Sequence, residues 1–165
     1  MSFLTSAANI KQTPKRGKYK LCNNELFQDK DKTIYLAWRG FITDNFTWLK
    51  TNKWDIRCSH IHDVGCQYHQ LVKVNLTQDE LLIKKLLVYV KQTDSWYCKD
   101  IPIEYLQVVD ISKFEINNLF YRMLSYADCP KMPKFLQVLY RIGVAFNLHW
   151  FFTGKESINL SKIYS

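Results

Sequence analysis

Glycine and proline are scarce in this sequence of 165 residues, with five and four copies. Long flexible linkers are rich in such residues, so a single domain spanning residues 1–165 is expected. A disordered chain is excluded, because 47% of the residues are hydrophobic and 15% are aromatic. The sequence also has no phosphate-cradling glycine loop, no nucleophile elbow and no dinucleotide fingerprint, so nothing in it supports nucleotide-dependent chemistry.

No apolar run is long enough to cross a membrane as a helix. The most apolar stretch, residues 135–152, is interrupted by polar side chains, whereas a spanning helix needs about 20 nearly uninterrupted apolar residues. We therefore expect a buried helix there and no membrane insertion. Residues 1–5 lack a basic segment followed by an apolar run, so no signal peptide is expected. The five cysteines are irregularly spaced, and without an export signal we expect them to be reduced thiols.

Acidic residues are in deficit, since 15 of them face 23 lysines and arginines, for a formal net charge of +8. Residues 1–60 hold most of the excess, with 11 basic residues against 5 acidic ones. Such a segment can neutralise phosphates and release counterions, which favours nucleic acid as a partner. The same charges also suit a solvated face that keeps the protein soluble, which is the commoner arrangement in a small basic protein. The candidate nucleic-acid-binding residues form a basic arm within residues 1–20: Lys11, Lys15, Arg16, Lys18 and Lys20.

The hydrophobic pattern predicts an α+β fold, with a small β-rich N-terminal part packed on about three to four helices. Residues 33–38 are β-branched and aromatic, which is typical of a strand, and residues 103–109 are a weaker strand candidate. Two sets of residues, Thr77 with Glu80 and Ser112 with Glu115, have the spacing of a capping box at the start of a helix.

The expected helices are one from near His60, one after Thr77 with an apolar face up to Val90, one after Ser112, and one from Pro133 to about Phe152. The tail 154–165 is polar and is expected to fray.

Three of the four histidines and two cysteines lie within twelve residues of the chain. If a helix begins at His60, then His62, Cys66 and His69 share one helical face. Imidazole and thiolate together suit zinc, so these three residues are the candidate metal ligands and zinc is the candidate cofactor. Three other interpretations stay open: a core cysteine beside hydrogen-bonded histidines, metal-free acid–base chemistry, and Cys66 as a nucleophile activated by His62 or His69.

Asp44 is the best partner for this cluster from elsewhere in the chain, because it follows the expected strand end. A carboxylate there would orient His62 for general base catalysis or bind a metal beside it. The same residues also fit a structural role, in which Thr43 and Asp44 stabilise a turn and His62 hydrogen-bonds to the Asp44 carboxylate.

The order of several short motifs resembles a known family. Gly40-Phe41-Ile42-Thr43-Asp44 is followed by His62-Asp63 at the head of a helix, then by the helix through residues 115–124 and by Tyr140-Arg141-Ile142-Gly143-Val144. This order is similar to that of the phage-associated family catalogued as domain of unknown function 1353. Two residues depart from its pattern, since Leu49 stands where a proline is expected and Asn117 where an aspartate is expected, and residues 71–111 resemble an insertion.

The resemblance implies a phage origin and a candidate catalytic site of Asp44, His62 and Asp63, but no established activity. The first hypothesis is a phage accessory or virion-associated protein that binds a phage or host protein, or nucleic acid. The second is a small metal-assisted hydrolase centred on those three residues, and the third is a phage inhibitor of a host defence system. Whether the chain is an enzyme stays open, as does its oligomeric state. The expected location is the cytoplasm of the infected host or the virion.

Overall fold

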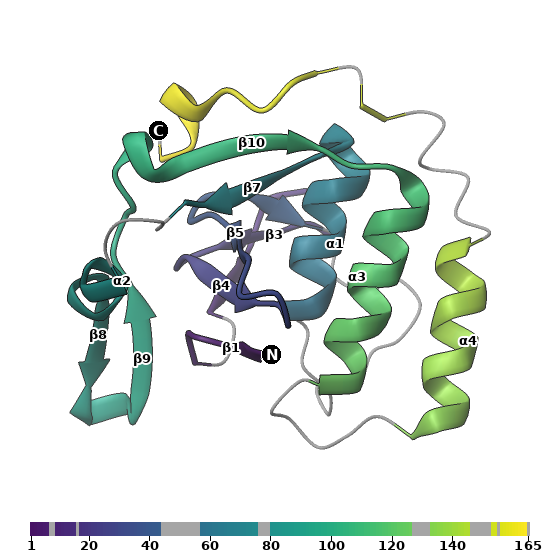
Figure 1. The fold of residues 1–165 in the computed structure, drawn as a ribbon, viewed down its shortest axis with the longest axis horizontal. Coiled ribbons are helices and arrows are strands. Elements are labelled where there is room, and N and C mark those ends of the chain that lie inside the picture. The colour runs from purple at the N-terminus through teal and green to yellow at the C-terminus, as the bar shows by residue number, and fades with distance from the viewer. Residues whose placement is uncertain are drawn as a thin grey trace.

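The computed structural model describes residues 1–6, 9–15, 17–43, 57–75, 80–126, 133–145, 153–154 and 156–164. It has the predicted α+β fold, with a sheet-rich N-terminal part. The main sheet is five-stranded and every neighbouring pair is antiparallel (Figure 1). Its strands, in spatial order, are β1 (Ser2–Phe3), β4 (Glu25–Gln28), β5 (Ile34–Ala37), β7 (Gln70–Val74) and β10 (Leu106–Asp110).

Two helices lie side by side against this sheet, and a third lies outside them (Figure 1). Helix α1 (Arg57–Tyr68) contacts β5 and β7, and α3 (Lys113–Tyr126) packs on α1. Helix α4 (Lys134–Ala145) packs on the other side of α3. None of the helices in the part of the chain that the structure describes is long and apolar enough to cross a membrane.

Two smaller sheets flank the main one. The first contains β2 (Ile10–Gln12), β3 (Tyr19–Leu21) and β6 (Ile42–Thr43), with β3 in the middle. The second is the hairpin of β8 (Leu87–Val90) and β9 (Ser95–Cys98), preceded by the short helix α2 (Glu80–Leu86). Short 3-10 turns occur at Lys91–Thr93, Ile103–Tyr105 and Leu160–Lys162.

One row of side chains crosses all five strands of the main sheet. The residues directly opposite one another are Phe3, Phe27, Tyr35, Lys73 and Gln107. Side chains two residues apart in a strand share a face, so Glu25, which contacts α1, places this row on the helix-covered face. Phe27 is completely buried, Lys73 is half-buried and Gln107 is exposed. The row therefore changes from aromatic core to polar surface as it crosses the sheet.

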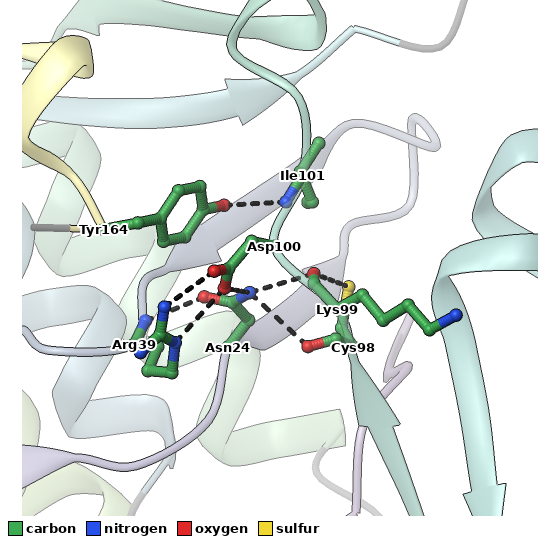
Figure 2. Close-up of polar contacts among 7 residues, drawn as sticks. All are labelled: Asn24, Arg39, Cys98, Lys99, Asp100, Ile101 and Tyr164. Carbon is green, nitrogen blue, oxygen red and sulfur yellow. Dashed lines mark hydrogen bonds and ion pairs between the residues drawn. The ribbon is translucent and has the colours of Figure 1, made fainter.

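Asn24 joins the β8–β9 hairpin to the main sheet (Figure 2). Its amide nitrogen donates to the carbonyl of Lys99 at 2.9 Å and to Asp100 Oδ1 at 3.2 Å, and the Cys98 carbonyl lies 3.4 Å away. Its amide oxygen accepts from the backbone nitrogen of Arg39 at 2.7 Å. The Arg39 guanidinium in turn pairs with the Asp100 carboxylate at 2.7 Å. A single buried amide thus joins the chain before β4, the end of β5 and the end of β9.

The described part of the C-terminal segment is packed, so the expectation of a frayed polar tail is wrong. Ile158 and Ile163 are 8% and 3% exposed, and the Tyr164 hydroxyl accepts a hydrogen bond from the backbone of Ile101 (Figure 2). Isoleucines five positions apart carry no helix or strand period, so only their burial in the folded chain reveals their role.

Two predicted helices also need correction. The helix after Thr77 was expected to extend to Val90, but α2 ends at Leu86 and the next four residues form β8. Residues 87–90 pair with β9 instead of continuing the helix, and the spacing of the apolar residues carries no information about this partner strand. Thr77 itself lies outside the described residues.

The helix after Pro133 was expected to be buried, but α4 leaves much of its apolar surface exposed. Phe135 is 65% exposed and Leu139 is 57% exposed, because α4 lies at the end of the helical layer and packs mainly on α3.

Two local predictions from the sequence are confirmed. Strand β5 lies within residues 33–38, and the capping box of α3 forms as predicted, with Ser112 and Glu115 bonded in both directions.

Candidate functional site

A buried polar cluster lies between α1 and α3. His62 and Cys66 are one helical turn apart on α1, with the Cys66 sulfur 3.5 Å from His62 Nε2. The same imidazole nitrogen lies 3.0 Å from Asn117 Oδ1 of α3, and the ring packs on Phe120 with centroids 4.6 Å apart. His62 is 5% exposed and Cys66 is 7% exposed. The structure therefore brings a thiol, an imidazole and an amide together in the core.

A glycine permits this close approach of the two helices. A Cβ atom added to Gly65 would lie only 2.5 Å from Cγ1 of Ile116. The turn of α1 between His62 and Cys66 thus packs directly against α3, which brings His62 within reach of Asn117. A larger residue at this position would push the two helices apart.

Asp63 connects α1 to the three-stranded sheet of β2, β3 and β6. The hydroxyl of Thr43 in β6 donates to Asp63 Oδ2. Thr43 and Asp63 belong to the two short motifs that were singled out in the sequence, so the structure brings those motifs together. Asp44, the remaining candidate catalytic residue, lies outside the described residues.

His69 does not join His62 and Cys66. Helix α1 ends at Tyr68, and His69 adopts a left-handed backbone conformation with φ of 54°. Its Nε2 lies 3.3 Å from the Thr153 hydroxyl, and Gly154 packs against its ring. The predicted common face of three ligands is therefore wrong for His69, because a residue beyond the helix end loses the helical period. Across the ranges that the structure describes, no group of three or more cysteine, histidine or acidic side chains is placed to hold a metal ion.

A buried contact between a histidine and a glutamate, beside this cluster, was missed in the sequence. His60 Nδ1 lies 2.8 Å from Glu25 Oε2, and both side chains are almost fully buried. Glu25 Oε1 is buried without a hydrogen-bond partner among the described residues. Part of the signal was present, since Glu25 stands two residues before the core residue Phe27 and must share its face of the strand.

The predicted basic arm is a β-hairpin. Lys11 in β2 lies directly opposite Lys20 in β3, and both are exposed. Lys15, in the connecting turn, is exposed, while Lys18 is half-buried. Arg16 lies outside the described residues. The structure therefore gathers four of the five candidate residues on one hairpin.

Comparisons with protein-family models, with curated proteins and with solved structures found no match to this chain. What the protein does must therefore be inferred from its own geometry.

Proposed function

We propose that the protein acts by binding, and that its partner is nucleic acid contacted by the β2–β3 hairpin. The observation that carries this proposal is the exposed pair of Lys11 and Lys20, directly opposite each other in the hairpin. Neither lysine, nor Lys15 in the turn, forms an ion pair with a carboxylate of the described residues. Three ammonium groups on one hairpin are thus available to an external anion.

Electrostatics favours a polyanion here. Like charges directly opposite each other in a sheet are destabilising, by a few tenths of a kcal/mol to about 1 kcal/mol. A phosphate bound between Lys11 and Lys20 removes this repulsion and releases condensed counterions from the nucleic acid. Interactions of this kind bind the backbone without reading the base sequence, so we expect little sequence preference.

The resemblance to a phage-associated family favours an accessory or virion-associated protein of a phage as the setting for this activity. Under this proposal the protein meets nucleic acid in the infected cell or in the particle. A protein partner is the alternative outcome of the test below.

The test is fluorescence anisotropy with labelled single-stranded and duplex oligonucleotides over a series of salt concentrations. We expect binding that weakens steeply with salt. Replacing Lys11 and Lys20 with glutamine should lower the slope of log affinity against log salt by about 2, because each lysine neutralises about one phosphate. The matched control replaces Lys84 and Lys85, two exposed lysines of α2, and carries the same net charge. Equally weakened binding in both variants, or no binding at low salt, would contradict the proposal and favour a protein partner.

A metal-assisted hydrolase is the second candidate. It is favoured by two contacts at motif positions of the resembled family, one between Thr43 and Asp63 and one between His62 and Asn117, although Asn117 stands where that family has an aspartate. Elemental mass spectrometry of protein purified without a metal-affinity tag tests it. About one transition metal per chain, absent from His62→Ala, would support the hydrolase. A natural protein without metal would leave these side chains with a structural role.

A further inference from the structure

A cavity of about 320 Å³ lies between the main sheet and α3, on the same face as the row of side chains that crosses the strands. This volume is at the small end of the range for pockets that bind small molecules, so it suits a compact ligand and not a polymer. The residues that line it come from β5, β7, β10 and α3: Tyr35, Lys73, Val109, Asp110, Ile111, Glu115, Asn118, Leu119 and Arg122.

Most of the charged groups on the wall are already engaged by this chain. Asp110 Oδ1 accepts from the side-chain amide of Gln70 at 2.9 Å. Glu115 Oε2 accepts from the backbone nitrogen and the hydroxyl of Ser112, at 2.8 and 2.6 Å. These hydrogen bonds lower the pKa of the Glu115 carboxyl, which therefore stays ionised. The Arg122 guanidinium donates to Asp29 at 2.6 Å.

Three polar groups on the wall are not engaged. Among the described residues, the side chains of Tyr35, Lys73 and Asn118 form no hydrogen bond, and Lys73 forms no ion pair. The Lys73 ammonium lies 5.9 Å from the centroid of the Tyr35 ring, so the two groups are neighbours. Burial and the nearby carboxylate of Asp29 raise the pKa of Tyr35 to about 12, so its hydroxyl remains a donor at neutral pH. A cation and two neutral donors thus share one small cavity.

We propose that this cavity binds a small molecule through a carboxylate or phosphate group, with Lys73 as the counter-charge and Tyr35 and Asn118 as hydrogen-bond donors. Oxyanions are the ligands that such a donor set recognises. Arg122 is already paired with Asp29, so Lys73 is the cation of the wall that forms no ion pair among the described residues. With one such cation on the wall, a ligand with a single anionic group is favoured over a polyanion. This site is therefore separate from the basic hairpin.

The test is a titration followed by backbone-amide NMR at constant ionic strength, with inorganic phosphate and acetate as separate probes. We expect saturable shifts at Lys73, at residues 109–111 and at Asn118 with at least one probe. Phosphate alone would identify a phosphate ligand, and acetate alone a carboxylate ligand. Lys73→Met should weaken binding about tenfold or more, because it removes a charge-assisted hydrogen bond. The matched control is Lys99→Met, an exposed lysine away from the cavity, which should bind like the natural protein.

Tyr35→Phe removes only a hydroxyl and provides the second variant if Lys73→Met does not fold. It should weaken binding several-fold with the same pattern of shifted amides. The proposal is overturned if neither probe gives saturable shifts, or if Lys73→Met binds as tightly as the natural protein. If Lys73→Met folds, unchanged affinity in Tyr35→Phe would overturn only the role of the Tyr35 hydroxyl. If Lys73→Met does not fold, unchanged affinity in Tyr35→Phe would overturn the proposed site.

Discussion

Replacing Asn24 with alanine should destabilise the protein by about 3 kcal/mol. Asn24 is 1% exposed, and its two amide hydrogens serve the Lys99 carbonyl at 2.9 Å and Asp100 Oδ1 at 3.2 Å. Its oxygen accepts from the Arg39 backbone at 2.7 Å. Each of these three hydrogen bonds contributes about 1 kcal/mol, and buried partners left unsatisfied add to the loss. The interaction at 3.4 Å with the Cys98 carbonyl is long, and it competes for the same two hydrogens.

The assay is equilibrium unfolding in urea, followed by tryptophan fluorescence. With an m-value of about 2 kcal/mol/M, a destabilisation of about 3 kcal/mol lowers the midpoint by about 1.5 M. Asn23→Ala is the matched control, because Asn23 is adjacent, only half-buried, and forms no side-chain hydrogen bond to a described residue. A midpoint shift in Asn24→Ala that is no larger than the shift in Asn23→Ala would refute the idea that Asn24 fastens the hairpin.

Three further predictions concern packing, acid stability and thiol reactivity. Gly65→Ala should lower the free energy of unfolding by about 1 to 3 kcal/mol, because the added Cβ meets Ile116 at 2.5 Å. In a background that already carries Ile116→Ala, the same substitution should cost less, and strictly additive losses in the double variant would contradict this explanation. The hydrogen bond from Arg39 lowers the pKa of Asp100 in the folded protein. The Asp100 carboxylate therefore contributes its full stabilisation above its unfolded pKa of about 3.8, and this stabilisation is lost as the pH falls through the lower folded pKa. Asp100→Asn should therefore lose less stability than the natural protein between about pH 4 and pH 2, as measured by urea midpoints. Burial raises the pKa of Cys98 to about 12, so alkylation at about pH 8, mapped by peptide mass spectrometry, should label the partly exposed Cys22 well before Cys98; equal rates would count against this packing.

Local signals in the sequence were sufficient where the structure is local. The capping box at Ser112 and the apolar period after it placed α3, and the β-branched run at residues 33–38 placed β5. The helical start near His60 located most of α1. These predictions hold because the residues that decide each element lie within a few positions of one another.

The remaining features depend on interactions between distant parts of the chain. The pairing of Glu25 with His60 joins residues 35 positions apart, and no local pattern encodes it. Likewise, His62 and Asp63 were placed on one helix, but their partners Asn117 and Thr43 come from α3 and β6. The helical period also predicted that His69 shares a face with His62 and Cys66. That prediction fails because α1 ends at Tyr68, one residue before His69.

The end of α1 has a consequence for how the chain folds as it is made. The carbonyls of Cys66 and Gln67, in the last turn, accept hydrogen bonds from the Thr153 hydroxyl at 2.5 Å and the Gly154 backbone at 2.9 Å. These donors are synthesised 87 residues after the carbonyls that they serve. At about 5 to 20 residues per second, the ribosome takes roughly 4 to 17 seconds to supply them. Throughout that interval the last turn of the nascent helix waits for its capping donors, so this domain completes its fold late in translation. A ribosome stalled ahead of Thr153 would therefore present an unfinished domain to chaperones and proteases.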